Sequence, residues 1–211
     1  DRTGSMSDIW NEALASVNEY ARSVGEADAG EIDGSDIETR VTLAVFDHQD
    51  GMQFDVLRDE VRAENWRKVT DDEASPRGMT PLYDAIGRIV NLAENDNPGR
   101  AVIVVMTDGA ENSSRELTKQ GAKAALDRAR ARGWEVVFLG TEFANFDDAE
   151  GVGNAGSKNM AVGRDQMQGS MSDLAKKSRA YGKGEAPEIV FDENDRAKAD
   201  EDGVKDRTGQ K

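Results

Sequence analysis

The sequence contains no cysteine and only one histidine, His48, among its 211 residues. Without cysteine, the chain cannot form a disulfide framework, a thiolate zinc site, an iron–sulfur cluster or a cysteine nucleophile. A Ser-His-Asp arrangement would depend on His48 alone, and we expect this residue to lie in a surface turn. No apolar run approaches the roughly 18–20 residues that span a bilayer, and no signal peptide is visible. We therefore expect a cytoplasmic protein, although the sequence begins at Asp1 rather than at a methionine.

Basic residues are also scarce, with 27 Lys and Arg against 42 Asp and Glu, which gives a formal net charge of −15. Because nucleic acids and anionic membranes bind to basic surfaces, we expect neither as a partner. The apolar fraction of 37%, together with 21 glycines, is enough to build a core. The length fits one domain, which we place at residues 1–181, followed by a charged, flexible tail over 182–211.

The pattern of apolar residues predicts strands that alternate with helices. We expect an antiparallel hairpin of strands 39–46 and 52–57, buried strands over 101–106 and 134–139, and an edge strand over 160–162. We expect helices over 7–24, 81–93, 113–132, 143–152 and 166–181, the third opened by a capping box of Ser113 and Glu116, and an acidic loop over 26–38. This order predicts an α/β fold with a doubly wound, mainly parallel central sheet and an antiparallel edge.

Oxygen-bearing side chains occur in three separate segments that this fold would bring together. Asp1, Thr3 and Ser5 alternate just before the first helix, Thr80 precedes Pro81 at the start of another helix, and Asp108 follows a buried strand. Ligands of open parallel sheets bind at the carboxyl ends of the strands. Two carboxylates and three hydroxyls suit Mg²⁺, Mn²⁺ or Ca²⁺ better than zinc or copper.

In this order and spacing, the three segments resemble the metal-ion-dependent adhesion site of a von Willebrand factor A (VWA) domain. That family has an Asp-x-Ser-x-Ser motif, a distant Thr and an Asp at a strand end. The resemblance covers about residues 1–163 and implies a Rossmann-like fold with a metal site formed by Asp1, Thr3, Ser5, Thr80 and Asp108. Thr3 departs from the usual serine but keeps the hydroxyl. The first central strand of the family, which the motif would end, is missing from this sequence.

The resemblance implies a metal-dependent protein-binding module and not an enzyme. In such a module, Mg²⁺, or Mn²⁺ or Ca²⁺ in its place, sits at the top of the sheet and takes an acidic oxygen of a protein partner. The chain resembles the small bacterial and phage members of this family, and AAA+ ATPase systems are among the partners that the resemblance suggests.

Two other functions stay open from the sequence. One is a Mg²⁺-dependent phosphohydrolase, and the other is a structural or virion-associated module with a vestigial metal site. Each segment also has an ordinary structural interpretation. Asp1 to Ser5 can cap a helix, Thr80 can be the N-cap before Pro81, and Asp108 can belong to a turn.

Overall fold

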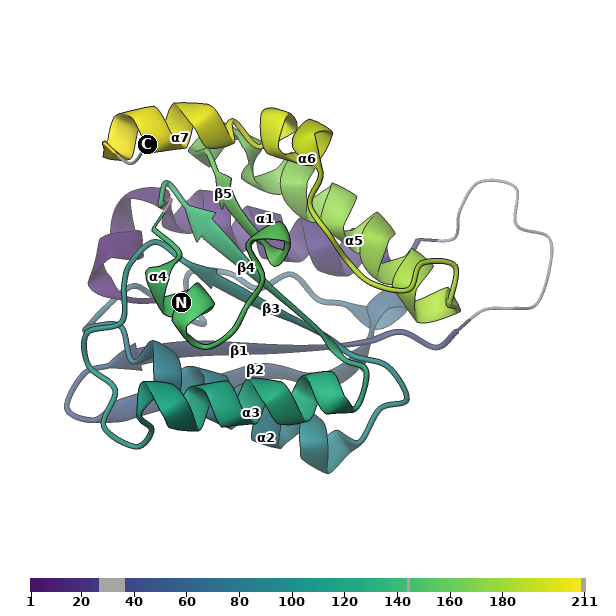
Figure 1. Cartoon of the computed structure of the whole chain (residues 1–211), viewed down its shortest axis with the longest axis horizontal. Helices are drawn as coiled ribbons and strands as arrows, with labels where there is room; N and C mark the ends of the chain where they lie inside the picture. The colour runs from purple at the N-terminus through teal and green to yellow at the C-terminus, as the bar shows by residue number, and fades with distance from the viewer. Residues whose placement is uncertain (27–36, 144, 210–211) are drawn as a thin grey trace.

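The computed structural model describes residues 1–26, 37–143 and 145–209. It has the expected α/β fold, with a two-stranded antiparallel sheet and a three-stranded parallel sheet (Figure 1). The strands are β1 (Arg40–His48) and β2 (Met52–Arg62) in the first sheet, and β3 (Val102–Thr107), β4 (Glu135–Thr141) and β5 (Asn159–Val162) in the second. The helices are α1 (Trp10–Val24), α2 (Leu82–Asp96), α3 (Lys119–Ala131), α4 (Asp147–Gly151), α5 (Met167–Lys183), α6 (Glu193–Lys198) and α7 (Glu201–Thr208). Most of the acidic loop expected over 26–38 lies outside the described residues.

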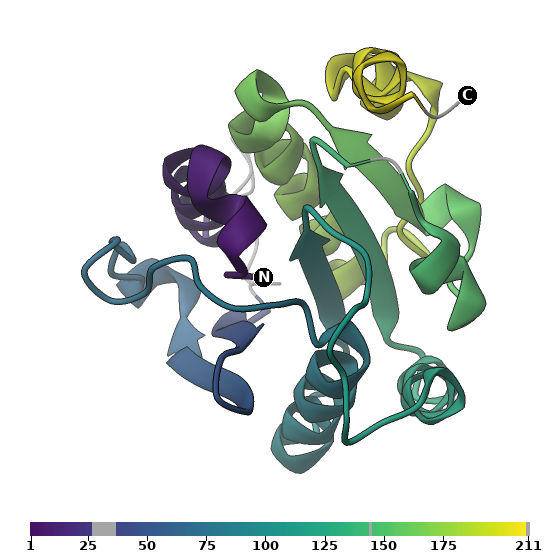
Figure 2. The same cartoon turned by 90° about the vertical axis from the view of Figure 1, so that its left-hand side faces the viewer.

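The parallel sheet is covered by helices on both faces, as the continuous apolar runs of β3 and β4 predict. Every residue of β4 is buried. Val137 and Leu139 pack in a cluster with α1 and α5, whereas Val136 and Phe138 pack with α2 and α3. Figure 2 shows these helix pairs on opposite sides of the sheet. In the described ranges, no helix is long and apolar enough to cross a membrane.

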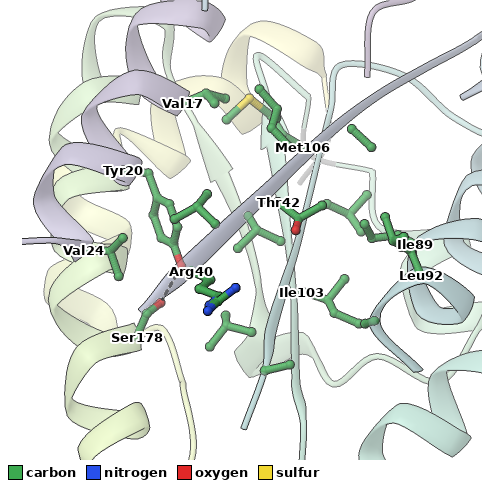
Figure 3. Close-up of a pocket in the computed structure, with 18 of the residues that line it drawn as sticks. Val17, Tyr20, Val24, Arg40, Thr42, Ile89, Leu92, Ile103, Met106 and Ser178 are labelled. Atoms are coloured by element: carbon green, nitrogen blue, oxygen red, sulfur yellow. Dashed lines mark hydrogen bonds between the residues drawn. The ribbon is translucent and has the colours of Figure 1, made fainter. Parts of the chain in front are cut away.

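The two sheets are not hydrogen-bonded to each other along their length. A cavity of about 890 Å³ lies between β1 and β3, and α1, α2 and α5 also line it. Figure 3 shows Val17 of α1 and Leu92 of α2 lining this groove from opposite sides. The facing edges of β1 and β3 thus have room between them for a further strand, and a missing central strand stays a prediction. At the carboxyl ends of β1 and β3, the first two residues bridge the gap. The Asp1 amine donates to the Met106 carbonyl at 3.0 Å, and the Arg2 N–H donates to a β1 carbonyl, also at 3.0 Å.

Three helix starts differ from the sequence predictions by three residues or more. Helix α4 begins at Asp147 and not at residue 143. The segment before α1 is a 3₁₀ turn over Gly4–Ile9, so the α-helix begins at Trp10 and not at Ser7. The predicted capping box of Ser113 and Glu116 is wrong, because α3 begins at Lys119 after an N-cap at Thr118. The N–H groups near residue 113 are bound instead by carboxylates from outside the helix, so no helical turn forms there.

The segment after Gly182 is folded in the structure, contrary to the flexible tail that its charge suggests. Helices α6 and α7 pack beside β5, and the side chains of Ile189, Phe191 and Val204 are buried. The Glu201 carboxylate accepts the Ala161 N–H at 3.2 Å, which satisfies a backbone donor of this edge strand. A few buried apolar residues dock these two short helices together with polar contacts, such as the ion pair of Asp195 with Lys177 of α5 at 2.9 Å.

Candidate functional site

Side chains from three distant segments meet at the carboxyl end of β3. The Ser5 hydroxyl donates to Asp108 Oδ1 at 2.8 Å, and the Thr3 and Ser5 hydroxyl oxygens lie 3.2 Å apart. A Cβ atom placed on Gly109 would lie 3.6 Å from the Thr80 hydroxyl oxygen and 3.9 Å from that of Ser5. The structure therefore brings together the three hydroxyl groups that the sequence singled out, next to Asp108.

Asp1, the fifth expected residue, joins this group through its neighbours. Its carboxylate accepts the Thr3 N–H at 2.8 Å through Oδ1 and the Thr107 hydroxyl at 2.7 Å through Oδ2. The sequence analysis did not single out Thr107, although its hydroxyl directly precedes Asp108. Burial lowers the pKa of the Asp1 amine to about 5. Burial also raises the pKa of the Asp108 carboxyl, and the hydrogen bond from Ser5 opposes that rise.

Thr80 does not cap helix α2, although its place before Pro81 suggested that it could. Pro81 holds the N-cap position instead, and Thr80 is only 3% exposed. Its hydroxyl has no hydrogen-bond partner within the described part of the chain. Asn112, another residue that the sequence analysis missed, holds the backbone of Thr80. Asn112 Oδ1 accepts the Thr80 N–H at 2.8 Å, and the Asn112 N–H donates to the Thr80 carbonyl at 3.1 Å.

The two arginines nearest to these segments are engaged by carboxylates of the hairpin. Arg2 is buried and donates to Asp47 at 2.6 Å and to Asp55 at 2.5 Å. Arg77 is partly exposed and donates to Asp47 at 3.2 Å. The ion pairs of Arg2 attach the Asp1–Ser5 segment to the hairpin.

The donor set fits a small, hard cation. Two ligands at right angles around Mg²⁺, each about 2.1 Å from it, are about 3.0 Å apart. The separation of 3.2 Å between the Thr3 and Ser5 oxygens is close to that value. The hydroxyl oxygens of Thr80 and Ser5 both lie within 4 Å of one point at Gly109. No cluster of three or more His, Cys, Asp or Glu side chains that could hold a metal occurs among the described residues, so hydroxyls have to supply part of any such site.

Comparison with known proteins identifies the family. The family model of the von Willebrand factor type A domain matches residues 1–177, and the chain therefore belongs to this family. Domains of this family are generally protein-interaction modules. The solved structures include a von Willebrand factor type A protein from Catenulispora acidiphila, with 13% sequence identity and a TM-score of 0.49. The match covers 85% of this chain and 41% of that one. No curated protein sequence matches the chain.

Proposed function

We propose that the chain binds a protein partner through a divalent cation held at the carboxyl end of β3. Thr3, Ser5 and Thr80 would bind the cation through their hydroxyls, and Asp1 and Asp108 would hold its water ligands. Mg²⁺ is the first candidate, and Mn²⁺ and Ca²⁺ are the alternatives. The cation would supply a positive charge with an open position for an anionic oxygen, such as a carboxylate of the partner.

One observation carries this proposal. The Thr80 hydroxyl belongs to a buried residue, lacks a partner among the described residues and lies, like the Ser5 hydroxyl, within 4 Å of one point at Gly109. The oxygen is not among the described polar atoms that are both sealed from solvent and unpaired, so it is open to a ligand. An accessible hydroxyl without a protein partner, gathered with two others at the end of a strand, can serve as a ligand for a cation.

Two observations favour binding over phosphate hydrolysis. The common motif of Mg²⁺-dependent phosphohydrolases has a second aspartate two residues after the first, and Thr3 occupies that position. Arg2 and Arg77, the nearest cations in sequence, are paired with Asp47. Neither is therefore free to stabilise a transferring phosphoryl group.

Isothermal titration calorimetry with Mg²⁺ and Mn²⁺ tests the metal site. We expect one cation per chain, with binding lost in Asp108→Ala and in Thr80→Ala. Glu116→Ala provides a control, because it also removes a carboxylate of this region but that carboxylate is paired with Arg88. Equal binding by the unmodified chain and by Asp108→Ala would contradict the proposal.

The role of the cation in partner binding has a separate test. A chain with a charge of −15 repels an acidic partner unless a cation lies between them. In interferometry with an isolated partner, binding should require Mg²⁺ or Mn²⁺ and vanish in EDTA. High salt should weaken it much less, because a coordination bond is not screened like a surface ion pair. Full-strength binding in EDTA would remove the cation from the mechanism.

A further inference from the structure

The first turn of helix α2 is capped from outside the helix. Pro81 at its N-cap position makes no side-chain cap hydrogen bond. Instead, Glu111 Oε2 accepts the Tyr83 N–H at 3.0 Å, and the Ser114 hydroxyl accepts the Asp84 N–H at 3.2 Å. Both acceptors belong to the loop between β3 and α3. Residues far along the chain thus satisfy the backbone donors that an N-cap side chain usually binds.

Glu111 accepts the hydrogen bond of the N–H group that the Thr80 hydroxyl could otherwise bind. Thr80 lies one residue before the N-cap Pro81 and would itself be the N-cap if the helix began one residue earlier. A Ser or Thr N-cap accepts a hydrogen bond from the second or third N–H after it. Tyr83 is the third residue after Thr80, and its N–H is bound to Glu111. This explains how a threonine next to a helix start keeps a hydroxyl without a partner in the described ranges.

The carboxylate of Glu111 is held firmly in this position. Its Oε1 accepts the Ser113 N–H at 2.9 Å and the Ser114 N–H at 2.7 Å, and its Oε2 accepts the Ser114 hydroxyl at 2.7 Å. A negative charge at a helix N-terminus is also favourable, because the helix dipole is positive there. Next to Glu111, Asn112 fixes the backbone of Thr80 through two hydrogen bonds.

We propose that Glu111 is a positioning residue, which caps helix α2 in place of Thr80 and so keeps the Thr80 hydroxyl free for the cation. The inference rests on the proposed metal site. When Glu111 is removed, the Tyr83 N–H loses its acceptor. The Thr80 hydroxyl then turns to that N–H, and the site loses one of its three hydroxyl ligands.

Titration with Mg²⁺ by calorimetry tests this role. Glu111→Ala should weaken Mg²⁺ binding about 10-fold or more, as losses of groups that orient metal ligands do. Glu111→Gln keeps a carbonyl oxygen for the Tyr83 N–H and should retain more of the affinity. Glu116→Ala removes the same charge from the same loop and should change the affinity less than about 2-fold. Unchanged Mg²⁺ affinity in Glu111→Ala, or equal losses in Glu111→Ala and Glu116→Ala, would overturn the inference.

A measurement without metal separates this inference from the proposed function. If Thr80 takes over the cap, Glu111→Ala should lower Tm less in the chain with Thr80 than in a Thr80→Val background, which has no hydroxyl. Equal Tm losses in the two backgrounds would overturn the inference, whether or not the chain binds metal. Failure of the unmodified chain to bind Mg²⁺ would overturn the proposed function, and the metal-free comparison would still decide the role of Glu111 in the cap.

Discussion

The β1–β2 hairpin and the β3–β5 sheet are held in place in different ways. Every residue of β4 is buried, whereas β2 has no buried residue. The free edge of β5 is covered by the C-terminal helices, while the facing edges of β1 and β3 border an apolar groove. Near the candidate site, the hairpin is joined to the rest of the chain by backbone bonds and by the ion pairs of Arg2. Val45 and Phe46 of β1 also join the two apolar clusters, so polar contacts around the site add to apolar packing in holding the hairpin.

The candidate site lies at this junction. Asp108 follows β3 of the parallel sheet. Thr80 follows Met79, which pairs with His48 of the hairpin through hydrogen bonds of 2.9 and 3.2 Å. The Asp1–Ser5 segment contacts the hairpin through Arg2 and strand β3 through the Asp1 amine. A cation bound by all three segments would therefore clamp the two sheets together, and four predictions test this comparison.

The largest effect should come from filling the groove. We expect a segment of six apolar, β-branched residues joined to Asp1 to pair with β1 and β3. Each buried side chain contributes about 1.5–3 kcal/mol, against about 1.5 kcal/mol for ordering each residue. Differential scanning calorimetry should show a rise in Tm of roughly 10 °C or more. A Gly/Ser extension of equal length is the control, and a rise of only about 1 °C would mean that the groove does not accept a strand.

Removal of Arg2 should loosen the hairpin. Asp47 is fully buried, and Arg2→Ala would leave its charge with only the partly exposed Arg77. Removing one partner of a buried ion pair costs about 3–5 kcal/mol. In urea unfolding, we expect Arg2→Ala to lower the free energy of unfolding by an amount near the lower end of this range. Arg77→Ala removes the exposed partner of the same carboxylate and should cost less than about 1 kcal/mol. Similar losses in the two variants would show that burial of Arg2 does not matter.

Mg²⁺ should stabilise the folded chain by joining the β1–β2 hairpin to the parallel sheet. At a concentration 100-fold above Kd, a ligand of the folded state stabilises it by about 2.7 kcal/mol. For a chain of this size, that corresponds to a rise in Tm of about 5–10 °C. The rise should disappear in Asp108→Ala. If Asp108→Ala shows the same rise, the cation only screens the excess negative charge.

The smallest effect should come from Thr3→Ser. The serine keeps the hydroxyl and restores the usual residue of the family motif. We expect a Kd for Mg²⁺ within about 3-fold of that of the unmodified chain, because the ligand atom is unchanged. A larger change in calorimetry would show that the buried methyl group of Thr3 helps to shape the site.

The sequence predicted those parts of the structure that local patterns determine. The alternation of apolar residues indicated the hairpin, and the continuous runs indicated β3 and β4. The three segments of the candidate site were found because each contains oxygen ligands beside a strand or helix end. Whether these segments bind a metal stays a prediction.

Long-range hydrogen bonds account for what the sequence did not show. Ser113 and Glu116 have the spacing of a capping box, but their N–H groups are bound by Glu111 and Asp84. Likewise, the pairing of Arg2 with Asp47 joins residues that are 45 positions apart. The folded C-terminal segment was missed because its few apolar residues, such as Phe191, show no local periodicity. They become buried only when the segment packs beside β5.

The central claim is that one cation binds where the hairpin and the parallel sheet meet, and NMR with paramagnetic Mn²⁺ tests it most directly. In a ¹⁵N-labelled chain, substoichiometric Mn²⁺ should first broaden the amide signals of Thr3, Ser5, Thr80 and Gly109 together, and EDTA should restore them. Loss of signals first around exposed acidic residues such as Asp71 and Asp72, with the signal of Thr80 unchanged, would contradict the account.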